Sequence, residues 1–177
     1  LTHYEYFDAD VEKVFNRKAK NNGYMNTAHY PDKCIAQFLK ESSTKAWYKN
    51  TVFIITSDHA HILPLGRNYN EPGRHHIPFL IFGEPLKPEF RGKTFEKTAS
   101  QLDITPTMLA QLKAEHNQFK YGKDLFNPYT TGFAYYSFDN GFGFIADQTK
   151  VVYDYNLGKM ISCSDDSSNG NCSETER

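Results

Sequence analysis

Residues that could do metal or acid–base chemistry are concentrated in one short stretch of the chain. Asp58 and His59 are adjacent, and His61, His75 and His76 follow, so that four of the seven histidines fall in this stretch. An adjacent carboxylate and imidazole can both ligate one divalent ion if the chain bends between them. The alternative for an Asp-His dipeptide is a cap or a solvated surface pair, and spacing alone leaves both open. Of the two adjacent histidines, His75 is the expected bystander, because neighbours on an extended chain point opposite ways.

Two apolar runs flank this stretch and predict the strands that position it. Thr51 to Thr56 is a continuous β-branched and apolar run that ends directly before the Asp-His pair, and it is typical of a strand covered on both faces. Ile77 to Phe82 is a second buried strand, and His76 directly precedes it. Functional residues in α/β sheets gather beyond the carboxyl ends of strands. If the second strand runs antiparallel to the first, His76 lies at the same sheet edge as the Asp-His pair.

An upstream segment, Pro31 to Ser43, predicts a helix. Pro31 suits the first helical position and Asp32 the first turn, where we read it as capping rather than catalytic. The spacing places four apolar residues on one buried face: Cys34, Ile35, Phe38 and Leu39. We therefore expect Cys34 to be a small core residue.

A second helix is predicted from Ser100 to Lys113. Ser100 and Asp103 have the spacing of a capping box, and we expect Pro106 to restart the helix with Thr105 as its cap. The expected buried face consists of Met108, Leu109 and Leu112.

The remainder of the chain is rich in aromatic residues and turns. Residues 133–138, 142–146 and 151–155 read as short strands separated by Asp-Asn-Gly and Asp-Gln, which predicts an antiparallel meander. Ser162 to Arg177 contains no large apolar residue and is expected to be a solvated tail. The predicted organisation has three parts: a catalytic-core part at 1–115, a β subdomain at 116–161 and a polar tail at 162–177.

Composition limits the function classes. Hydrophobic residues make up 39% and aromatic residues 15% of the 177 residues, so a packed core is expected and general disorder is not. The net charge of -1 provides no basic field to attract nucleic acid. The apolar runs are too short to span a bilayer. The chain begins at Leu1 without a signal peptide, so we expect a processed protein or a fragment, with any membrane anchor lying upstream.

The three cysteines do not form a zinc-binding pattern. Cys163 and Cys172 flank a flexible Ser/Asp/Asn/Gly stretch. A disulfide between them, which would indicate an oxidising compartment, and two free thiols in a loose tail both remain open.

Three motifs resemble one known family. TVFIITSDHAHILP, RHHIPFLIFG and SQLDITPTML are similar to the sulfatase-like branch of the alkaline phosphatase superfamily, and most similar to its lipoteichoic acid synthase group of phosphoglycerol transferases. The resemblance covers roughly residues 1–160. It implies an α/β fold: the C-terminal part of an alkaline-phosphatase-like sandwich, with a mainly parallel sheet flanked by helices and a small antiparallel β meander.

The resemblance also implies roles for individual residues. Asp58 and His59 match the pair that holds the divalent metal. His76 matches a histidine at the substrate phosphate or a second metal, and His61 occupies the same loop. The N-terminal segment LTHYEYF resembles a segment whose histidine contacts the phosphate, which makes His3 a candidate, although alignment on its aromatic end places Tyr4 there.

The nucleophile implied by the resemblance is a threonine, and it lies upstream of this chain together with an acidic metal ligand. The implied activity of the parent protein is a metal-dependent phosphotransferase acting on a phospholipid-derived or other phosphate or sulfate ester, with one Mn, Zn or Mg ion. The alternatives are a sulfatase or phosphodiesterase hydrolase of the same superfamily, and a non-catalytic binding or structural module. The 177 residues alone are expected to be inactive and to self-associate, and the parent is expected to be membrane-anchored with an extracytoplasmic catalytic domain.

Overall fold

The computed structural model describes residues 20–146 and 149–164. Contacts divide the chain into two compact units, one comprising residues 1–68 and 73–93 and the other residues 69–72 and 94–177. The predicted boundary between residues 115 and 116 falls inside the second unit, and the three-part organisation stays a prediction. Among the described residues, no helix combines the length and the apolarity needed to cross a bilayer.

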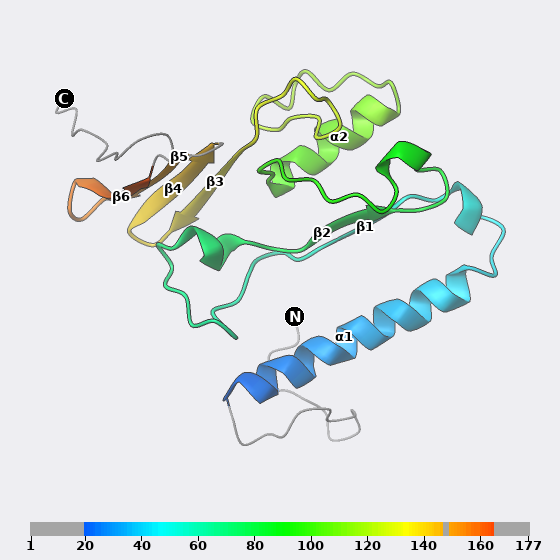
Figure 1. The fold of residues 1–177 in the computed structure, drawn as a ribbon, viewed down its shortest axis with the longest axis horizontal. Helices are drawn as coiled ribbons and strands as arrows, with labels where there is room; N and C mark the ends of the chain where they lie inside the picture. Colours follow the sequence, from blue (N-terminus) through cyan, green and yellow to red (C-terminus); the bar gives the residue numbers. More distant parts are fainter. Residues whose placement is uncertain (1–19, 147–148, 165–177) are drawn as a thin grey trace. The chain divides into compact units, whose positions relative to one another are not determined.

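The first unit is built from one long helix and a two-stranded sheet. Helix α1 spans Lys20–Ser42, strand β1 Phe53–Thr56 and strand β2 Phe79–Phe82 (Figure 1). β1 and β2 pair antiparallel, with Phe53 opposite Phe82 and Thr56 opposite Phe79. The chain therefore leaves β1 and enters β2 at the same end of the sheet. The prediction that His76 approaches the Asp-His pair required this antiparallel pairing.

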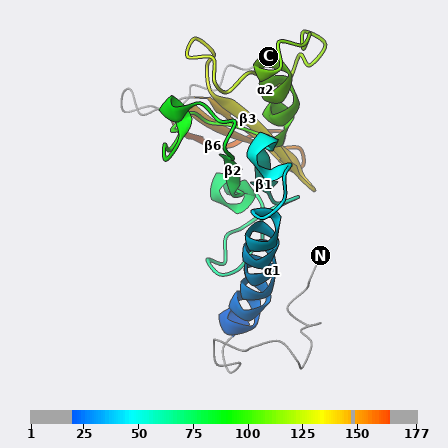
Figure 2. The ribbon, with the colours of Figure 1, turned by 90° about the vertical axis from the view of Figure 1, so that its right-hand side faces the viewer.

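Helix α1 begins well before the predicted start. Pro31 lies inside it rather than at its first position. Proline lacks the N–H that would bond to the carbonyl four residues earlier, so the helix loses one backbone bond there. The ribbon nevertheless continues through this point without a sharp kink (Figures 1 and 2).

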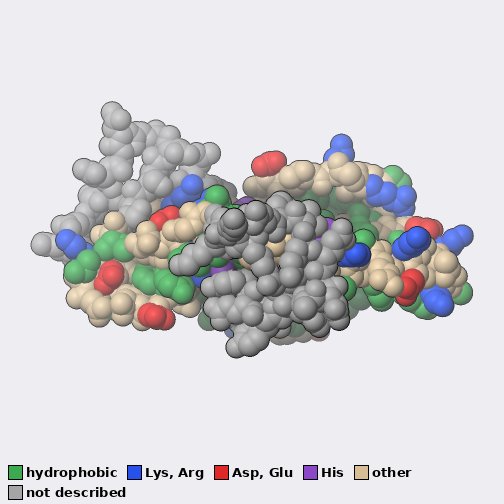
Figure 3. Space-filling view, turned by 90° about the horizontal axis from the view of Figure 1, so that it is seen from below, with side chains coloured by type: hydrophobic (Ala, Val, Ile, Leu, Met, Phe, Trp, Pro, Cys, Tyr) green, Lys and Arg blue, Asp and Glu red, His purple; other side chains and the backbone are tan. Residues whose placement is uncertain are grey.

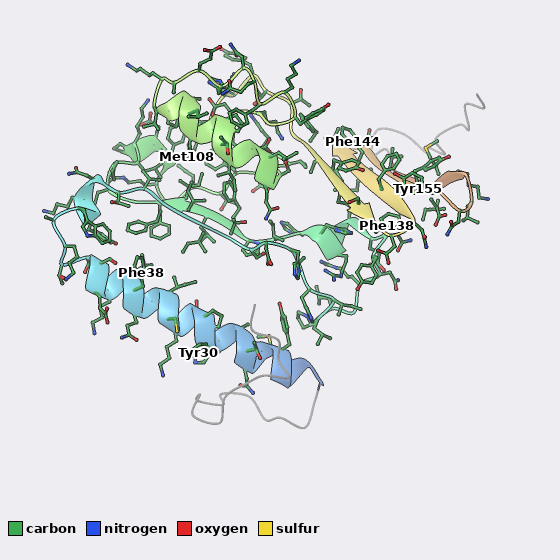
Figure 4. All side chains as sticks on the ribbon, turned by 180° about the vertical axis from the view of Figure 1, so that it is seen from behind. Tyr30, Phe38, Met108, Phe138, Phe144 and Tyr155 are labelled. Atoms are coloured by element: carbon green, nitrogen blue, oxygen red, sulfur yellow. The ribbon has the colours of Figure 1, made fainter. Side chains whose placement is uncertain are left out.

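The predicted buried face of α1 is wrong for most of its residues. Cys34 is an exposed free cysteine, Ile35 is 37% exposed and Phe38 is 53% exposed. Phe38 meets the Phe53 ring of β1 edge-on at 6.4 Å between ring centroids, at the end of the helix labelled in Figure 4. The apolar spacing thus grouped these residues on one face of the helix, but the prediction that this face is buried is wrong.

The two strands of the first unit are half-buried rather than covered on both faces. Leu80 of β2 is 50% exposed, and no residue of β1 or β2 is fully buried. Their cohesion comes from aromatic contacts: the Phe53 ring stacks on Phe82 at 5.3 Å and also meets Tyr48 at 5.3 Å. The expectation of two-sided coverage is wrong for the described residues, because Thr56 and Leu80 are exposed and the other strand positions are only partly buried.

The second unit begins with a capped helical segment. A 3-10 turn at Gln101–Asp103 carries the predicted capping box with Ser100, and helix α2 follows directly at Ile104–Gln111. Pro106 therefore does not restart the helix. The buried residues of α2 are Pro106 and Thr107, whereas Leu112, which was predicted to be buried, is 73% exposed.

A four-stranded antiparallel meander completes the second unit. Its strands follow chain order: β3 Phe133–Phe138, β4 Gly141–Ala146, β5 Thr149–Asp154 and β6 Lys159–Ser164. The meander and the α/β class are confirmed. β6 was not predicted, and it includes the first residues of the expected tail. Every strand pair in the described ranges is antiparallel, so the mainly parallel sheet has no counterpart in them.

The two faces of the meander differ. One face carries Val152, which is 1% exposed, and Tyr136, which is 8% exposed. Gly143 is required beneath the Tyr136 ring, because a Cβ at this position would lie 2.0 Å from its Cζ. The other face carries a series of stacked rings: Phe133 on Phe144, Tyr135 on Phe142 and Phe142 on Tyr153. Figure 4 labels Phe144 of this face.

A buried ion pair connects the capped helix to the chain that precedes β3. The Lys123 ammonium lies 2.7 Å from Asp103 Oδ2, with side-chain exposures of 6% and 0%. Asp103 also accepts hydrogen bonds from the backbone N–H groups of Ser100 and Lys123. Lys123 Nζ donates to the Phe133 carbonyl at 2.8 Å and lies 4.1 Å from the centre of the Phe133 ring. The buried Asp103 carboxylate therefore receives the Lys123 ammonium and two backbone N–H groups, all within the second unit.

Candidate functional site

A cavity lies at the end of the β1–β2 sheet where the loop between the strands begins and ends. Its volume is about 320 Å³, and three of the four loop histidines are in its wall. The wall residues that carry polar or aromatic side chains are Tyr24, Ser57, His59, His61, Arg67 and His76. All of them belong to the first unit.

Asp58 and His59 stand side by side at this end of β1. Asp58 Oδ2 lies 3.6 Å from His59 Nε2, and Asp58 Oδ1 accepts the backbone N–H of His59 at 2.9 Å. The two side chains are 52% and 62% exposed, respectively, so solvent can reach both. The carboxylate is therefore anchored by one oxygen, while the other oxygen faces the imidazole.

The second nitrogen of His59 determines which form of the ring is present. His59 Nδ1 lies 2.9 Å from the carbonyl oxygen of Ala60. A carbonyl oxygen can only accept, so Nδ1 carries a proton, and in the neutral ring Nε2 has a lone pair. That lone pair lies next to a carboxylate oxygen. Two electron-rich atoms at this separation are stabilised by a positive charge between them, which is either a proton or a metal ion.

The separation of these atoms fits a shared metal ion. Two ligands that each lie about 2.1 Å from one ion, at a tetrahedral angle, are about 3.4 Å apart. Metal-bound histidines also commonly donate their other N–H to a backbone carbonyl. Within residues 20–146 and 149–164, no group of three His, Cys, Asp or Glu side chains could hold an ion. Among the described residues, Asp58 and His59 alone are placed to contact one ion, and a complete coordination shell would need further ligands.

His61 is held in the opposite form. The backbone N–H of Leu63 donates to His61 Nδ1 at 3.0 Å, so in the neutral ring the proton is on Nε2. The His61 ring stacks on the Tyr24 ring of α1 at 4.9 Å between centroids, with 14° between the planes. A ring fixed in this way presents a hydrogen-bond donor, which suits an anionic oxygen of a ligand rather than a metal ion.

His76 joins this wall from the other strand. It is exposed and lies just before β2, as the antiparallel pairing requires. The structure therefore brings His59, His61 and His76 to one cavity, with the Asp58 carboxylate beside His59. His75 is not in the wall, consistent with the expectation that it is the bystander. His3, Cys172 and the side chain of Cys163 lie outside the residues that can be described.

Sequence reasoning missed three residues at this site. Arg67 is in the wall and donates to the Gly73 carbonyl at 2.7 Å, and a Cβ on Gly73 would lie 2.8 Å from its guanidinium carbon. Arg74 donates to the Ala60 carbonyl at 2.6 Å. The two arginines lie in the same loop as the histidines, which was the available signal. Tyr24 is far upstream on α1, and no local pattern points to it.

The charged side chains that are visible in Figure 3 are of both signs. On the face shown in Figure 3, Lys and Arg side chains are interspersed with Asp and Glu, and neither sign forms a continuous patch. A small anion would therefore be held by individual donors, such as Arg67 and His61, rather than by a broad basic field.

Comparison with known proteins assigns the chain to a family. The family model described as Sulfatase matches residues 2–114, which is more than half of the chain. The chain belongs to the sulfatase family. The match ends just after α2, so it includes the whole cavity wall and leaves out the meander.

A curated protein and a solved structure are also similar to this chain. Lipoteichoic acid synthase from Staphylococcus aureus (strain USA300) is 27% identical to this chain over 137 residues. The match covers 68% of this chain and 20% of the relative, and the same protein from strain NCTC 8325 / PS 47 gives the same values. A crystal structure of a protein in the alkaline phosphatase superfamily from Vibrio parahaemolyticus has a TM-score of 0.66 and 22% identity, covering 89% of this chain and 40% of that chain. The structural likeness confirms the fold. The chain spans only about one fifth of the length of the curated relatives.

Proposed function

We propose that this chain is the C-terminal part of the catalytic domain of a metal-dependent phosphotransferase of the sulfatase family, with a phosphoglycerol-transferase-like reaction. Its threonine nucleophile and remaining metal ligand are located upstream of this chain. The donor is a phospholipid-derived ester, and the acceptor is a second alcohol.

One observation carries this proposal: Asp58 Oδ2 and the lone-pair nitrogen of His59 lie 3.6 Å apart, next to a cavity lined by His61 and His76. The similarity to lipoteichoic acid synthase supports the transferase assignment. Because this chain corresponds to a small part of that relative, the activity belongs to the proposal for the whole protein.

Each site residue has a separate role in this proposal. Asp58 and His59 would hold one Mn, Zn or Mg ion, which would lower the pKa of a hydroxyl nucleophile and neutralise charge on the phosphoryl oxygens. His61 donates its Nε2–H to a phosphoryl oxygen, and Tyr24 keeps its ring in place. His76 stabilises a second oxygen or protonates the leaving alcohol. His3 remains a candidate for a further phosphate contact.

The second candidate is a hydrolase of the same superfamily, either a sulfatase or a phosphodiesterase. The exposure of Asp58 and His59 favours this candidate, because water can reach the pair. The two candidates differ in the acceptor: a transferase passes the group to an alcohol, whereas a hydrolase releases it to water.

The test uses the whole protein that contains this chain, supplied with a phosphatidylglycerol donor and Mn²⁺. Formation of a glycerophosphate ester on an added alcohol supports the transferase, and release of free glycerophosphate supports the hydrolase. We expect Asp58→Ala to abolish turnover and His76→Ala to lower kcat about 100-fold or more. The matched control is His116→Ala, because His116 Nδ1 also lies near a backbone oxygen, at 3.0 Å from Ala114, but in the second unit. Turnover that survives Asp58→Ala would refute both candidates.

The proposal also includes a membrane-anchored parent with an extracytoplasmic catalytic domain, which the similarity to lipoteichoic acid synthase supports. For the isolated 177 residues, we propose no turnover and self-association through exposed apolar side chains. Phe38 is 53% exposed and Leu80 is 50% exposed, and both belong to the first unit.

A further inference from the structure

We infer that Arg74 is a positioning residue: it holds the Ala60 carbonyl that orients the imidazole of His59 for metal binding. The inference rests on the metal role proposed for His59 and adds how that ring is kept in its ligand form. Arg74 does not touch the substrate or the ion in this arrangement.

The Ala60 carbonyl is the shared acceptor on which the inference depends. Arg74 Nη1 donates to it at 2.6 Å, and His59 Nδ1 lies 2.9 Å from the same oxygen. A backbone carbonyl has two lone pairs and can accept both bonds. Arg74 is 14 residues further along the chain, in the turn Pro72–His75, so this contact ties two ends of the loop together.

His59 needs such an external constraint. Its side chain is 62% exposed, so packing does little to orient its ring. The Ala60 peptide is only partly buried and lies in the irregular segment after β1, and its oxygen moves with any rotation of that peptide. The guanidinium is planar and rigid, and it makes charge-assisted bonds that are stronger than neutral ones. Arg74 therefore keeps the oxygen where Nδ1–H can donate to it, and the lone pair of Nε2 stays beside Asp58.

This arrangement has a measurable consequence for metal affinity. Groups that orient a metal-bound histidine through its second nitrogen typically change affinity 10- to 100-fold when they are removed. Arg74→Met removes the donors but keeps an apolar stem of similar reach, and Arg74→Lys keeps one donor. Arg91→Met is the matched control. Arg91 Nε also donates to a backbone carbonyl, that of Leu86, at 2.7 Å, and both residues belong to the first unit. Arg91 lies outside the cavity wall.

The experiment records imidazole ¹⁵N shifts of the metal-free 177-residue chain at a pH where the histidine rings are neutral, and then Mn²⁺ affinity by calorimetry. We expect the Nδ1–H form of His59 in the wild type and in Arg91→Met. Arg74→Met should contain a substantial Nε2–H fraction and bind Mn²⁺ about 10-fold or more weakly. Arg74→Lys should recover part of both properties.

Three results would overturn the inference: an Nε2–H form of His59 in the wild type, an unchanged tautomer in Arg74→Met, or an equal effect of Arg91→Met. If Arg74→Met does not fold, Arg74→Gln replaces it under the same criteria, since its amide is uncharged and its side chain is shorter than that of arginine. Absence of Mn²⁺ binding in every protein, including the wild type, would count against the proposed metal role, whereas the tautomer comparison would still decide the positioning role.

Discussion

Replacing Lys123 by Met should strongly destabilise the second unit. Lys123 is the only cation paired with Asp103 among the described residues, and the Asp103 side chain is fully buried. Removing one partner of a buried ion pair typically costs about 3–5 kcal/mol, because the remaining charge stays buried without compensation. Met preserves most of the apolar stem, so the lost packing is small.

The contacts of Asp103 and Lys123 narrow the expected loss of stability in Lys123→Met. Asp103 retains two backbone donors, Ser100 N–H at 2.7 Å and Lys123 N–H at 2.9 Å, which place the cost at the low end of the range. The Phe133 carbonyl loses the bond from Lys123 Nζ, which adds about 1 kcal/mol. We therefore expect a loss of about 4 kcal/mol. With a denaturant slope of about 1–3 kcal/mol per M, the urea midpoint should fall by roughly 1–4 M.

The assay is urea unfolding followed by near-ultraviolet circular dichroism, which reports on the tyrosine-rich meander. Lys120→Met is the matched control, because Lys120 is exposed in the same unit, and it should change stability by less than about 0.5 kcal/mol. Adding Asp103→Asn to Lys123→Met should recover part of the loss, since the stranded charge disappears. The reasoning would be refuted if Lys123→Met unfolded at the same urea concentration as Lys120→Met.

Three further predictions concern other parts of the chain. Burial raises the pKa of Tyr136 from 10.0 to about 12, so the tyrosine loses its proton at a lower pH in the unfolded state than in the folded state. About 2–3 kcal/mol of folding stability should therefore be lost as the pH rises from 10 to 12. Tyr136→Phe should flatten this part of the stability–pH curve, and an unchanged slope would contradict the assignment. Gly143→Ala should lower stability by about 1–3 kcal/mol in thermal unfolding, because its Cβ would overlap the Tyr136 ring, and a variant as stable as the wild type would argue against this packing. Sedimentation velocity of the isolated chain should show self-association that Phe38→Ser weakens, and a clean monomer would count against it.

The parts that could be predicted from the sequence are those in which a local pattern determines the structure. The run Thr51 to Thr56, the Asp-Asn-Gly turn and the Ser100–Asp103 capping box each appear where they were expected, apart from shifts of a few residues. The antiparallel hypothesis then placed His76 at the correct end of the first sheet. The metal role of Asp58 and His59 stays a prediction from spacing and resemblance, and the 3.6 Å between their side-chain atoms is compatible with it.

The rest depends on contacts that no local pattern records. The N-terminal half of α1 contains Gly and Asn, which are poor helix formers, and its most buried residues are polar: Asn26 is 1% and Thr27 is 6% exposed. β6 is an edge strand of mixed polarity, held by pairing with β5 rather than by an apolar pattern. The same limit applies to the site, where Tyr24 and Arg74 act through contacts distant in sequence.

The most direct test of the central claim is a Mn²⁺ titration of the ¹⁵N-histidine-labelled chain followed by NMR, because paramagnetic broadening detects even the weak binding of a two-ligand site. The account predicts that the His59 signals broaden first and that those of His61 and His76 follow. Asp58→Ala should abolish this selective order. Broadening that is equal at all histidines, or that is unchanged in Asp58→Ala, would contradict a metal site at the end of β1.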